Sequence, residues 1–329
     1  MTDDLPPFDR SGPAGEWVAR RYADVTAILA DDRFEVAQAP AAMQTGTIAW
    51  LRASVSRFTN GEEHQRRRAL AVAELAALDP GALRQDAHRR AAAALREAAT
   101  PGERVDVMAH LARRVPMAAM AAALGMAQPA QAAEAVIAAA AAYFPGADEQ
   151  TTHLADKATG QLVEMLSPAP LEVIVARIAL MVQGCDATAG LIGLTLLRLS
   201  GGQASAADEA TDTLLEAALR YDPVVRASRR VARESAAVGG AQVQPGDAVL
   251  CDVEAANLDP DAYQPPGRER PSLTFGAGLR PCPGPAQALA LAVGVVDAVR
   301  AGATLLPGQR ADYEPGPLRI PRRLDATLV

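Results

Sequence analysis

The sequence predicts a mainly α-helical fold with a small β region late in the chain, and two observations support this prediction. Over most of residues 15–220, apolar side chains recur about every 3.6 positions, in alanine- and leucine-rich segments that end at Pro or Gly. After Pro223, short β-type runs alternate with turn residues. No linker-like run divides the 329 residues, so we expect a single domain over 1–329 with an irregular segment at 1–14.

The first predicted helix spans residues 16–34, where Val18, Tyr22 and Val25 follow the helical period. The breaks "DPG" and "TPG" separate the helices that come next. These further helices are predicted at 64–78, 81–99 and 105–126.

A long apolar helix is predicted at 171–200, and its length would suit a membrane span. Arg177 and Asp186 interrupt it, however, and no aromatic belt flanks it. The first residues, "MTDDLPPFDR", lack the basic start and apolar core of a signal peptide. We therefore interpret the segment as a core helix and expect a cytoplasmic protein without a membrane partner.

The small sheet is predicted from β-type runs around Val231, Val243 and Val249, which Gly-Gly and the turn signal "QPGD" divide. A Pro-rich irregular stretch at 258–272 and a loop around Cys282 lead to a last helix at 285–301.

Charge and cysteine content exclude several classes of protein. The net charge of −7 and the pI near 5.3 argue against nucleic acid as a partner, because neutralising phosphates needs a basic surface. Cys185, Cys251 and Cys282 are odd in number and far apart, which suits a reducing compartment rather than a disulfide framework. Neither Cys nor His occurs in pairs at zinc-ligand spacing. Cys251 is interpreted as core, and Cys185 either as a packed helix residue or as a residue that faces a pocket.

Cys282 lies in the loop "FGAGLRPCPG", immediately before the last helix. A lone cysteine is commonly a small buried hydrophobe, but this loop does not suit that role. Its glycines, Gly284 among them, allow backbone conformations closed to other residues, so the chain can approach a flat ligand closely. The helix start and Arg280 favour a thiolate and an anionic neighbour. These properties predict an axial ligand to haem iron.

The same loop matches every fixed position of F-G-x-G-x-R-x-C-x-G and thereby resembles the haem-binding signature of the cytochrome P450 family. The resemblance implies a cytochrome P450-like fold, a haem b (iron protoporphyrin IX) and Cys282 as its metal ligand. The remaining fixed positions would contact the cofactor, and they are Phe275, Gly276, Gly278, Arg280 and Gly284.

Three further segments resemble the same family, so that the resemblance extends over about residues 15–325; one of them, "AANLDPDAY", resembles the loop that follows the family's propionate-binding strand. "GEEHQRRRAL" resembles the helix in which a His and an Arg four residues later meet a haem propionate, here His64 and Arg68. "RASRRVARESAAVGG" resembles the strand whose arginine binds the other propionate, here Arg230.

The central helix departs from the family pattern A-G-x-[D/E]-T, in which the acid and the threonine hydroxyl guide protons. "QGCDAT" keeps Gly184 and Asp186, but Ala187 takes the position of the threonine, and Thr188 follows it. One residue is a rotation of about 100° around a helix. Thr188 therefore needs a local bulge to point into the same groove. Asp186 and Thr188 are the predicted catalytic residues.

Two more departures concern the frame of the fold. The family's E-x-x-R ion pair is out of register here, because Glu216 and Arg220 are four residues apart. The two residues either form an ordinary surface pair or replace the family's ion pair, with Arg268 or Arg270 as the third member. Arg68 and Asp186 are only 118 positions apart, which shortens the region 131–167 that holds two roofing helices in the family. We expect a reduced distal lid and a pocket that is either more open or closed by a partner chain; a homo-oligomer is one option.

The resemblance implies a monooxygenase that inserts one oxygen atom from O2 into a small organic substrate, with electrons from a separate ferredoxin-type protein. Two alternatives stay open. The protein could use peroxide or catalyse a rearrangement or dehydration without the threonine, or it could be a degenerate relative that binds haem or a ligand without turnover. The pocket walls are expected at 38–58, 181–188 and 223–227, with a mostly apolar lining.

Overall fold

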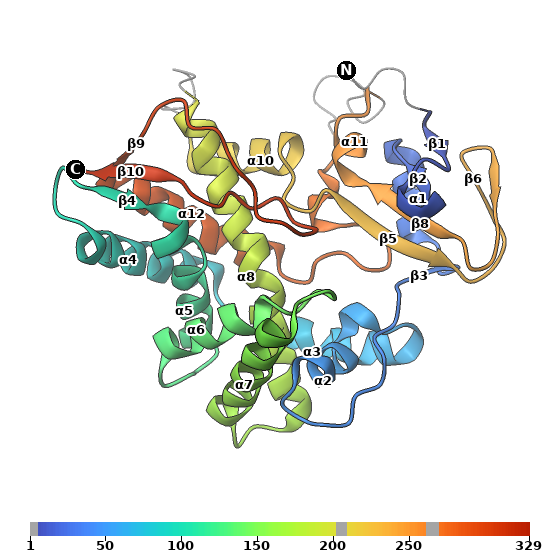
Figure 1. Cartoon of the computed structure of the whole chain (residues 1–329), viewed down its shortest axis with the longest axis horizontal. Coiled ribbons are helices and arrows are strands. Elements are labelled where there is room, and N and C mark those ends of the chain that lie inside the picture. Colours follow the sequence, from blue (N-terminus) through green and yellow to red (C-terminus); the bar gives the residue numbers. More distant parts are fainter. Residues whose placement is uncertain (1–5, 202–208, 261–269) are drawn as a thin grey trace. The chain divides into compact units, whose positions relative to one another are not determined.

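The computed structural model describes residues 6–201, 209–260 and 270–329, and the chain forms two compact units. Unit 1 consists of Met1–Gln38 and Leu219–Cys282, and unit 2 of Ala39–Ala218 and Pro283–Val329. The predicted fold class, mainly α-helical with a small β region, is confirmed (Figure 1). The single domain over 1–329 stays a prediction.

Unit 1 contains a five-stranded sheet in the order β1-β2-β8-β5-β3, in which only β2 and β8 run parallel. β6 and β7 form a separate hairpin. The helices α1 and α11 belong to this unit, and their apolar side chains share one core with the sheet. The bounds are β1 Phe8–Asp9, β2 Trp17–Ala19, α1 Tyr22–Ala30, β3 Phe34–Glu35, β5 Ala227–Ala232, β6 Ala236–Val238, β7 Ala241–Val243, β8 Ala248–Asp252 and α11 Val253–Asn257.

The predicted helix at 16–34 is wrong at both ends, because it begins as β2 and finishes as β3. Val18 fits the helical period, but in the structure it pairs with Leu250 of β8 and with Asp9 of β1. Long-range pairing has overridden the local pattern. The segment 1–14, predicted to be irregular, likewise contributes β1 to the sheet.

The predicted β runs and their turns are confirmed as β5, β7 and β8. In the "QPGD" turn, the amide of Asp247 donates to the carbonyl of Gln244 at 3.0 Å, and Gly246 takes φ 87°. That left-handed conformation at the third residue is the reason for a glycine after the proline. Two further left-handed glycines connect β6 to β7.

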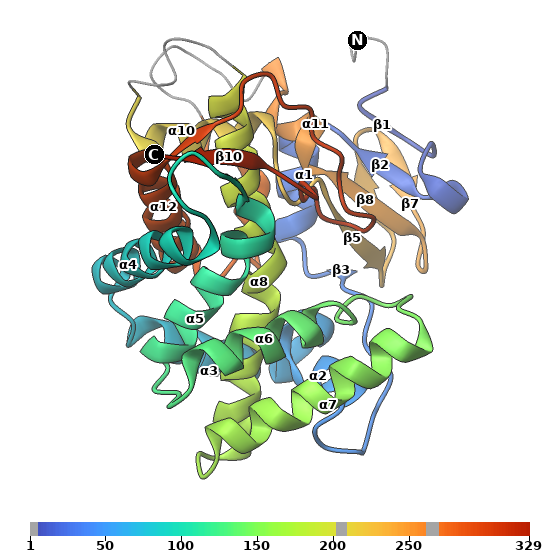
Figure 2. The same ribbon diagram turned by 60° about the vertical axis from the view of Figure 1, so that its left-hand side comes forward.

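Unit 2 is a bundle of helices around α8, with a three-stranded sheet in the order β4-β10-β9 (Figures 1 and 2). α3, α5, α6, α7 and α12 all pack against α8. The boundary between the units falls within α10 (Thr211–Tyr221). The other bounds are α2 Ile48–Ser54, α3 Gly61–Ala76, α4 Pro80–Ala98, β4 Arg104–Asp106, α5 Arg114–Ala123, α6 Pro129–Ala140, α7 Glu149–Leu166, α8 Leu171–Ser200, α12 Pro285–Gly302, β9 Ala303–Leu305 and β10 Asp325–Leu328.

Local signals explain where several helices of unit 2 begin. Asp79 accepts from the amides of Gly81 and Ala82 at the start of α4, and Asp148 accepts from Thr151 at the start of α7. The predicted helix at 105–126 is different, because β4 occupies its start and a turn of π-helix at 108–112 precedes α5. Single π-helical turns often mark functional sites.

α8 confirms the predicted core helix over 171–200. It is long and apolar enough to cross a membrane, but 67% of its most apolar window is buried inside the structure. From Thr188 to Leu196 every residue is buried. Such a run is typical of a helix that is surrounded by protein.

Candidate functional site

The loop before Cys282 folds back on itself through backbone hydrogen bonds. The amide of Cys282 donates to the carbonyl of Phe275 at 2.7 Å, and the amide of Gly276 donates to the carbonyl of Leu273 at 2.8 Å. Cys282 is half-buried, as are Phe275 and Arg280. The loop thus presents its cysteine partly to the surroundings, unlike the two cysteines of the cores.

Two glycines are required by the shape of this loop. Gly276 and Gly278 take φ 72° and 64°, which side chains with a Cβ rarely adopt. A Cβ on Gly278 would also lie 2.1 Å from the carbonyl oxygen of Leu29. The neighbouring amide of Leu279 donates to that same oxygen at 3.0 Å, so the loop is fastened to the end of α1.

Gly284 corrects the sequence argument. Its φ of −127° is open to any residue, so it does not supply the unusual conformation that we predicted for it. A Cβ there would lie 3.1 Å from a terminal methyl of Leu75, which is a tight contact with a flexible side chain. Close packing, rather than backbone conformation, favours glycine at this position.

Asn257, which the sequence analysis missed, supports the start of the loop. It is fully buried; its side-chain oxygen accepts from the amide of Leu273 at 2.7 Å, and its nitrogen donates to the carbonyl of Leu219 at 3.2 Å. Ser272 and Thr274 donate to that same carbonyl. A buried amide that satisfies several backbone groups fixes a loop more firmly than a surface contact does. The only available signal was an Asn within an otherwise apolar segment.

The Glu216 and Arg220 pair does not reproduce the family's ion pair. Glu216 is exposed, whereas Arg220 donates to the backbone carbonyl of Arg270 at 2.6 Å. The guanidinium of Arg270 lies 5.2 Å from the centre of the Tyr22 ring. Arg270 therefore meets Arg220 through its backbone, while Arg268 lies outside the described residues.

Arg230 is the buried arginine of unit 1. It projects from β5, is only 7% exposed, and donates to the Ser228 hydroxyl at 2.7 Å and to the Arg229 carbonyl at 2.8 Å. A guanidinium with so little solvent contact needs anionic or polar partners. The buried thiol of Cys251 lies on the paired strand β8, and burial raises its pKa to about 12, partly offset by Arg230. Its predicted position in the core is confirmed.

His64 and Arg68 both lie on α3 in unit 2. His64 is buried, and Arg68 is half-buried one turn later. Arg68 has no hydrogen bond or ion pair with any residue that the structure describes, and a half-buried guanidinium in that position suits an anionic partner such as a propionate.

Asp186 is already engaged within unit 2. Its carboxylate accepts from the Nε of Arg113 at 2.7 Å, and the same guanidinium donates to Glu314 at 2.5 Å. Burial alone would lower the pKa of Arg113, but these two carboxylates raise it above its usual value. These three charged groups could not be grouped from the sequence, because Arg113 and Glu314 lie 73 and 128 positions from Asp186.

Thr188 is buried on a helix that is α-helical from Leu171 to Ser200. The local bulge that would turn Thr188 toward the groove is not present in α8. The position at which the family has its threonine is therefore occupied by the half-buried Ala187. Cys185 is fully buried in the core of unit 2, which settles the two interpretations of this residue in favour of packing. Its burial raises the pKa of the thiol well above 9.0.

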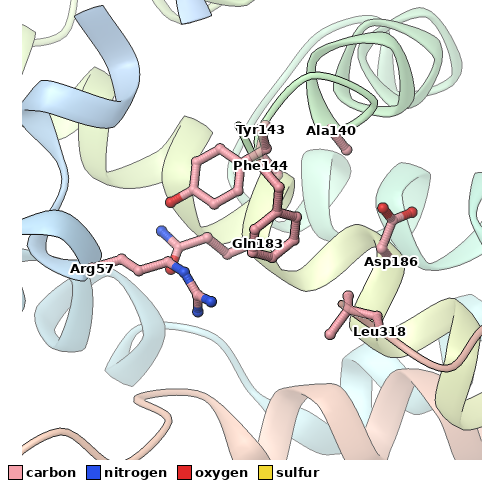
Figure 3. Close-up of a pocket in the computed structure, with 8 residues that line it drawn as sticks. Arg57, Ala140, Tyr143, Phe144, Gln183, Asp186 and Leu318 are labelled. Atoms are coloured by element: carbon pink, nitrogen blue, oxygen red, sulfur yellow. The ribbon is translucent and has the colours of Figure 1, made fainter. Parts of the chain in front are cut away.

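A small pocket lies beside α8 in unit 2 (Figure 3). The predicted ranges 38–58 and 181–188 contribute to it, and 223–227 does not. Four of its eight side chains carry polar groups, and the mostly apolar lining stays a prediction. The lining consists of Arg57, Ala140, Tyr143, Phe144, Val182, Gln183, Asp186 and Leu318.

Tyr143 and Phe144 are the pocket residues that the sequence could have revealed. Aromatic residues make up only 4% of the chain, and here two adjacent ones follow an alanine-rich helix and precede Pro-Gly. They lie between α6 and α7, the two helices that the range 131–167 was expected to hold. That this lid is reduced stays a prediction.

Comparison with known proteins places these features in context. No family model matches the chain. Nocardicin C N-oxygenase from Nocardia uniformis subsp. tsuyamanensis is 27% identical over 316 residues, which cover 83% of this chain and 78% of that protein. The cytochrome P-450 monooxygenase DoxA from Streptomyces peucetius subsp. caesius is 34% identical over 113 residues, which cover 31% and 26% of the two chains.

Solved structures resemble the fold over nearly the whole chain. CalO2 matches with a TM-score of 0.82 at 22% identity, covering 100% of this chain and 94% of its own. P450BioI, solved with a fatty-acid-ligated acyl carrier protein, matches with a TM-score of 0.77 at 19% identity, covering 98% and 95%.

Several relatives in sequence, DoxA among them, carry cytochrome P450 names, and the fold matches cytochrome P450 structures. The loop from Phe275 to Gly284 holds every fixed position of the haem-binding signature. The chain therefore has the fold of cytochrome P450s and resembles members of that family in sequence.

Proposed function

We propose that the protein is a haem-thiolate monooxygenase in which Cys282 holds the iron of haem b. The Cys282 loop carries this proposal, because two left-handed glycines and the carbonyl of Leu29 present a half-buried cysteine on a fastened turn. When bound, a thiolate-ligated haem activates dioxygen so that one oxygen atom passes to the substrate.

The donors of this chain fit that cofactor. Arg230, Arg68 and His64 would hold the two propionates through charge-assisted hydrogen bonds. Phe275, Gly276, Gly278, Arg280 and Gly284 would contact the macrocycle or its edge, as the family resemblance implies.

Asp186 would deliver protons on the distal side. Its carboxylate is held by Arg113, so it would have to exchange this partner for water before it passes a proton inward. Because Ala187 lacks the hydroxyl of the family's threonine, Thr188, an ordered water or a substrate hydroxyl would take its place in the proton path. Thr188 would act only through water, because it lies about 100° around α8 from that position.

The test is the absorption spectrum of the purified protein after reduction with dithionite and exposure to carbon monoxide. A Soret band shifted strongly to the red, absent in Cys282→Ser and kept in the control Cys251→Ala, would support the proposal. A spectrum typical of histidine ligation, or no haem, would contradict it and favour the non-catalytic relative.

A second assay separates monooxygenation from peroxide use. Turnover that requires both a reductant and dioxygen would support the monooxygenase and an external ferredoxin-type donor. Turnover with hydrogen peroxide alone would favour the peroxide-using alternative, and conversion of a substrate with neither oxidant nor reductant would favour a rearrangement or dehydration.

We further propose a cytoplasmic protein that needs no membrane or nucleic acid. The burial of α8 and the net charge of −7 support this part of the proposal. The pocket is either more open than in the family or closed by a partner chain. The mass of the protein in solution would test whether a second copy of this chain is that partner.

A further inference from the structure

We propose that the pocket beside α8 binds a small organic carboxylate and that Arg57 is its charge partner. This inference rests on the proposed function, since it names the substrate class of the same distal site. The observations that carry it are the charge of Arg57, the unsatisfied donors near it, and the opposite charge at the far end of the pocket.

Arg57 brings a positive charge to one end of the pocket. It lies on a short 3-10 turn at 56–58 and is exposed. No carboxylate among the described residues pairs with it; its guanidinium lies 5.3 Å from the ring centre of Phe144 and 5.8 Å from that of Phe58. A planar guanidinium held over aromatic rings keeps its edge available for two parallel hydrogen bonds to a carboxylate.

Tyr143 adds a donor without an acceptor. Its ring is 2% exposed, and its hydroxyl is buried without a hydrogen-bond partner in the described structure. Burial raises the pKa of Tyr143 above its ordinary value of 10.0, although Arg57 and Arg52 oppose the shift. The phenol therefore stays protonated at neutral pH and can donate. The Nε of Arg52 is also buried without an acceptor.

This end of the pocket thus carries more donors than acceptors, because Arg57 only donates, whereas Gln183 and Tyr143 both donate and accept. In Figure 3 the guanidinium of Arg57, the amide of Gln183 and the hydroxyl end of Tyr143 are drawn at one end, and Asp186 and Leu318 at the other. A buried donor without an acceptor is unfavourable, because it has lost its hydrogen bonds to water. An anion that enters beside Arg57 would supply acceptor oxygens where the protein supplies few.

The opposite end repels the same anion. Asp186 and Glu314 share the single guanidinium of Arg113, so the three groups carry one net negative charge. The carboxylate of a ligand should therefore point toward Arg57, and its uncharged end toward α8. Ala140, Phe144, Val182 and Leu318 offer apolar contacts for the body of the ligand, and a site lined by only eight residues suits a small molecule.

Isothermal titration calorimetry on the haem-containing protein tests this inference. The probes are a series from benzoate to 4-phenylbutyrate, each compared with its neutral amide, with 3-phenylpropylamine as a cation. We expect the best carboxylate to bind about fivefold or more tightly than its amide, and higher salt to reduce this preference. In Arg57→Gln the preference should be lost, and in Arg57→Lys it should fall only in part.

Arg89→Gln is the matched control, because it removes an exposed arginine of α4 that does not line the pocket. It should keep the preference of the unchanged protein. Equal binding of acid and amide, tighter binding of the cation, an unchanged preference in Arg57→Gln, or no binding of any carboxylate at millimolar concentration would each overturn the inference.

The readout separates this inference from the function on which it rests. The heat of binding does not depend on turnover or on the haem spectrum. A carboxylate preference that depends on Arg57 in a protein without thiolate ligation would leave the pocket assignment standing while the proposed function fails. Thiolate-ligated haem in a protein without an Arg57-dependent carboxylate preference would support the haem function and contradict the proposed substrate class.

Discussion

At the scale of single residues, Gly278 is held by two constraints at once. Its φ of 64° disfavours a side chain, and a Cβ would collide with the carbonyl oxygen of Leu29. Gly278→Ala should therefore lower the free energy of unfolding by about 1–3 kcal/mol or more and reduce the haem content. Urea unfolding and the ratio of haem to protein absorbance would measure the two effects.

Gly284→Ala is the control for that variant. Its backbone tolerates alanine, and only a methyl of Leu75 must shift, so a loss below about 1 kcal/mol is expected. If both variants lose equal stability, the left-handed turn at Gly278 is not the feature that fixes the loop.

Tyr143 provides a prediction on pH. Its pKa is raised in the folded protein by burial, so the folded state keeps a proton that the unfolded state loses near pH 10. The contribution of Tyr143 to stability is complete below pH 10 and is lost as the pH rises from 10 toward the folded-state pKa. Tyr143→Phe removes this dependence and the unsatisfied hydroxyl.

The measurement is the free energy of unfolding between pH 8 and 11. The free energy of unfolding of Tyr143→Phe should decline less steeply above pH 10 than that of the unchanged protein. At pH 8 the variant should be equally stable or up to about 1 kcal/mol more stable. Equal slopes would show that the hydroxyl has an acceptor or is open to water. Tyr221→Phe, at an exposed position, serves as the comparison.

At the scale of elements, the register of α8 decides which hydroxyl can serve the distal side. The helix has no bulge, so Ala187 and Thr188 face directions about 100° apart. Ala187→Thr should restore the family's arrangement and lower the hydrogen peroxide released per reducing equivalent by about half or more. Thr188→Ala should change this ratio little.

Peroxide release per electron, measured in air with a ferredoxin and a ferredoxin reductase that supply electrons continuously, gives this comparison without knowledge of the substrate. Thr188→Val controls for the loss of packing, because its shape is nearly the same. A large rise in peroxide release with Thr188→Ala and with Thr188→Val would instead assign the proton path to Thr188.

Elements were predictable from the sequence where local and long-range preferences agree. α4, α8 and α12 begin or end within a few residues of prediction, because caps, propensity and apolar period act together. The helix predicted at 16–34 failed at Trp17–Ala19, where β1 and β8 supply strand partners that no local pattern reveals.

At the scale of the whole molecule, haem should stabilise the folded chain by mass action, since the unfolded chain lacks the site. A cofactor present at 100 times its dissociation constant adds about 2.7 kcal/mol. We therefore expect the haem-loaded protein to melt several degrees above the haem-depleted protein, and Cys282→Ser to lose most of this difference. Differential scanning calorimetry of the two forms would show it, and Cys251→Ala should behave as the unchanged protein.

The site was predictable only where its residues lie close together in sequence. The loop from Phe275 to Gly284 carries a contiguous pattern, so its residues could be named from the sequence. Arg113, Glu314 and Arg57 could not, because only the fold brings the first two to Asp186 and the third to the pocket. From the sequence alone, charged residues of this kind are interpreted as solvent-exposed surface residues, because their tertiary contacts are not known.

The unequal connections of α7 have a consequence for the kinetics of ligand exchange. Four residues join α7 to α8, a tether of at most about 14 Å, whereas eight residues join α6 to α7 and could span about 28 Å. Any swing of α7 would therefore pivot at its carboxyl end and open widest at its amino end. Tyr143 and Phe144 lie in that longer connection, so ligand entry and escape should be paced by the same side chains that line the pocket.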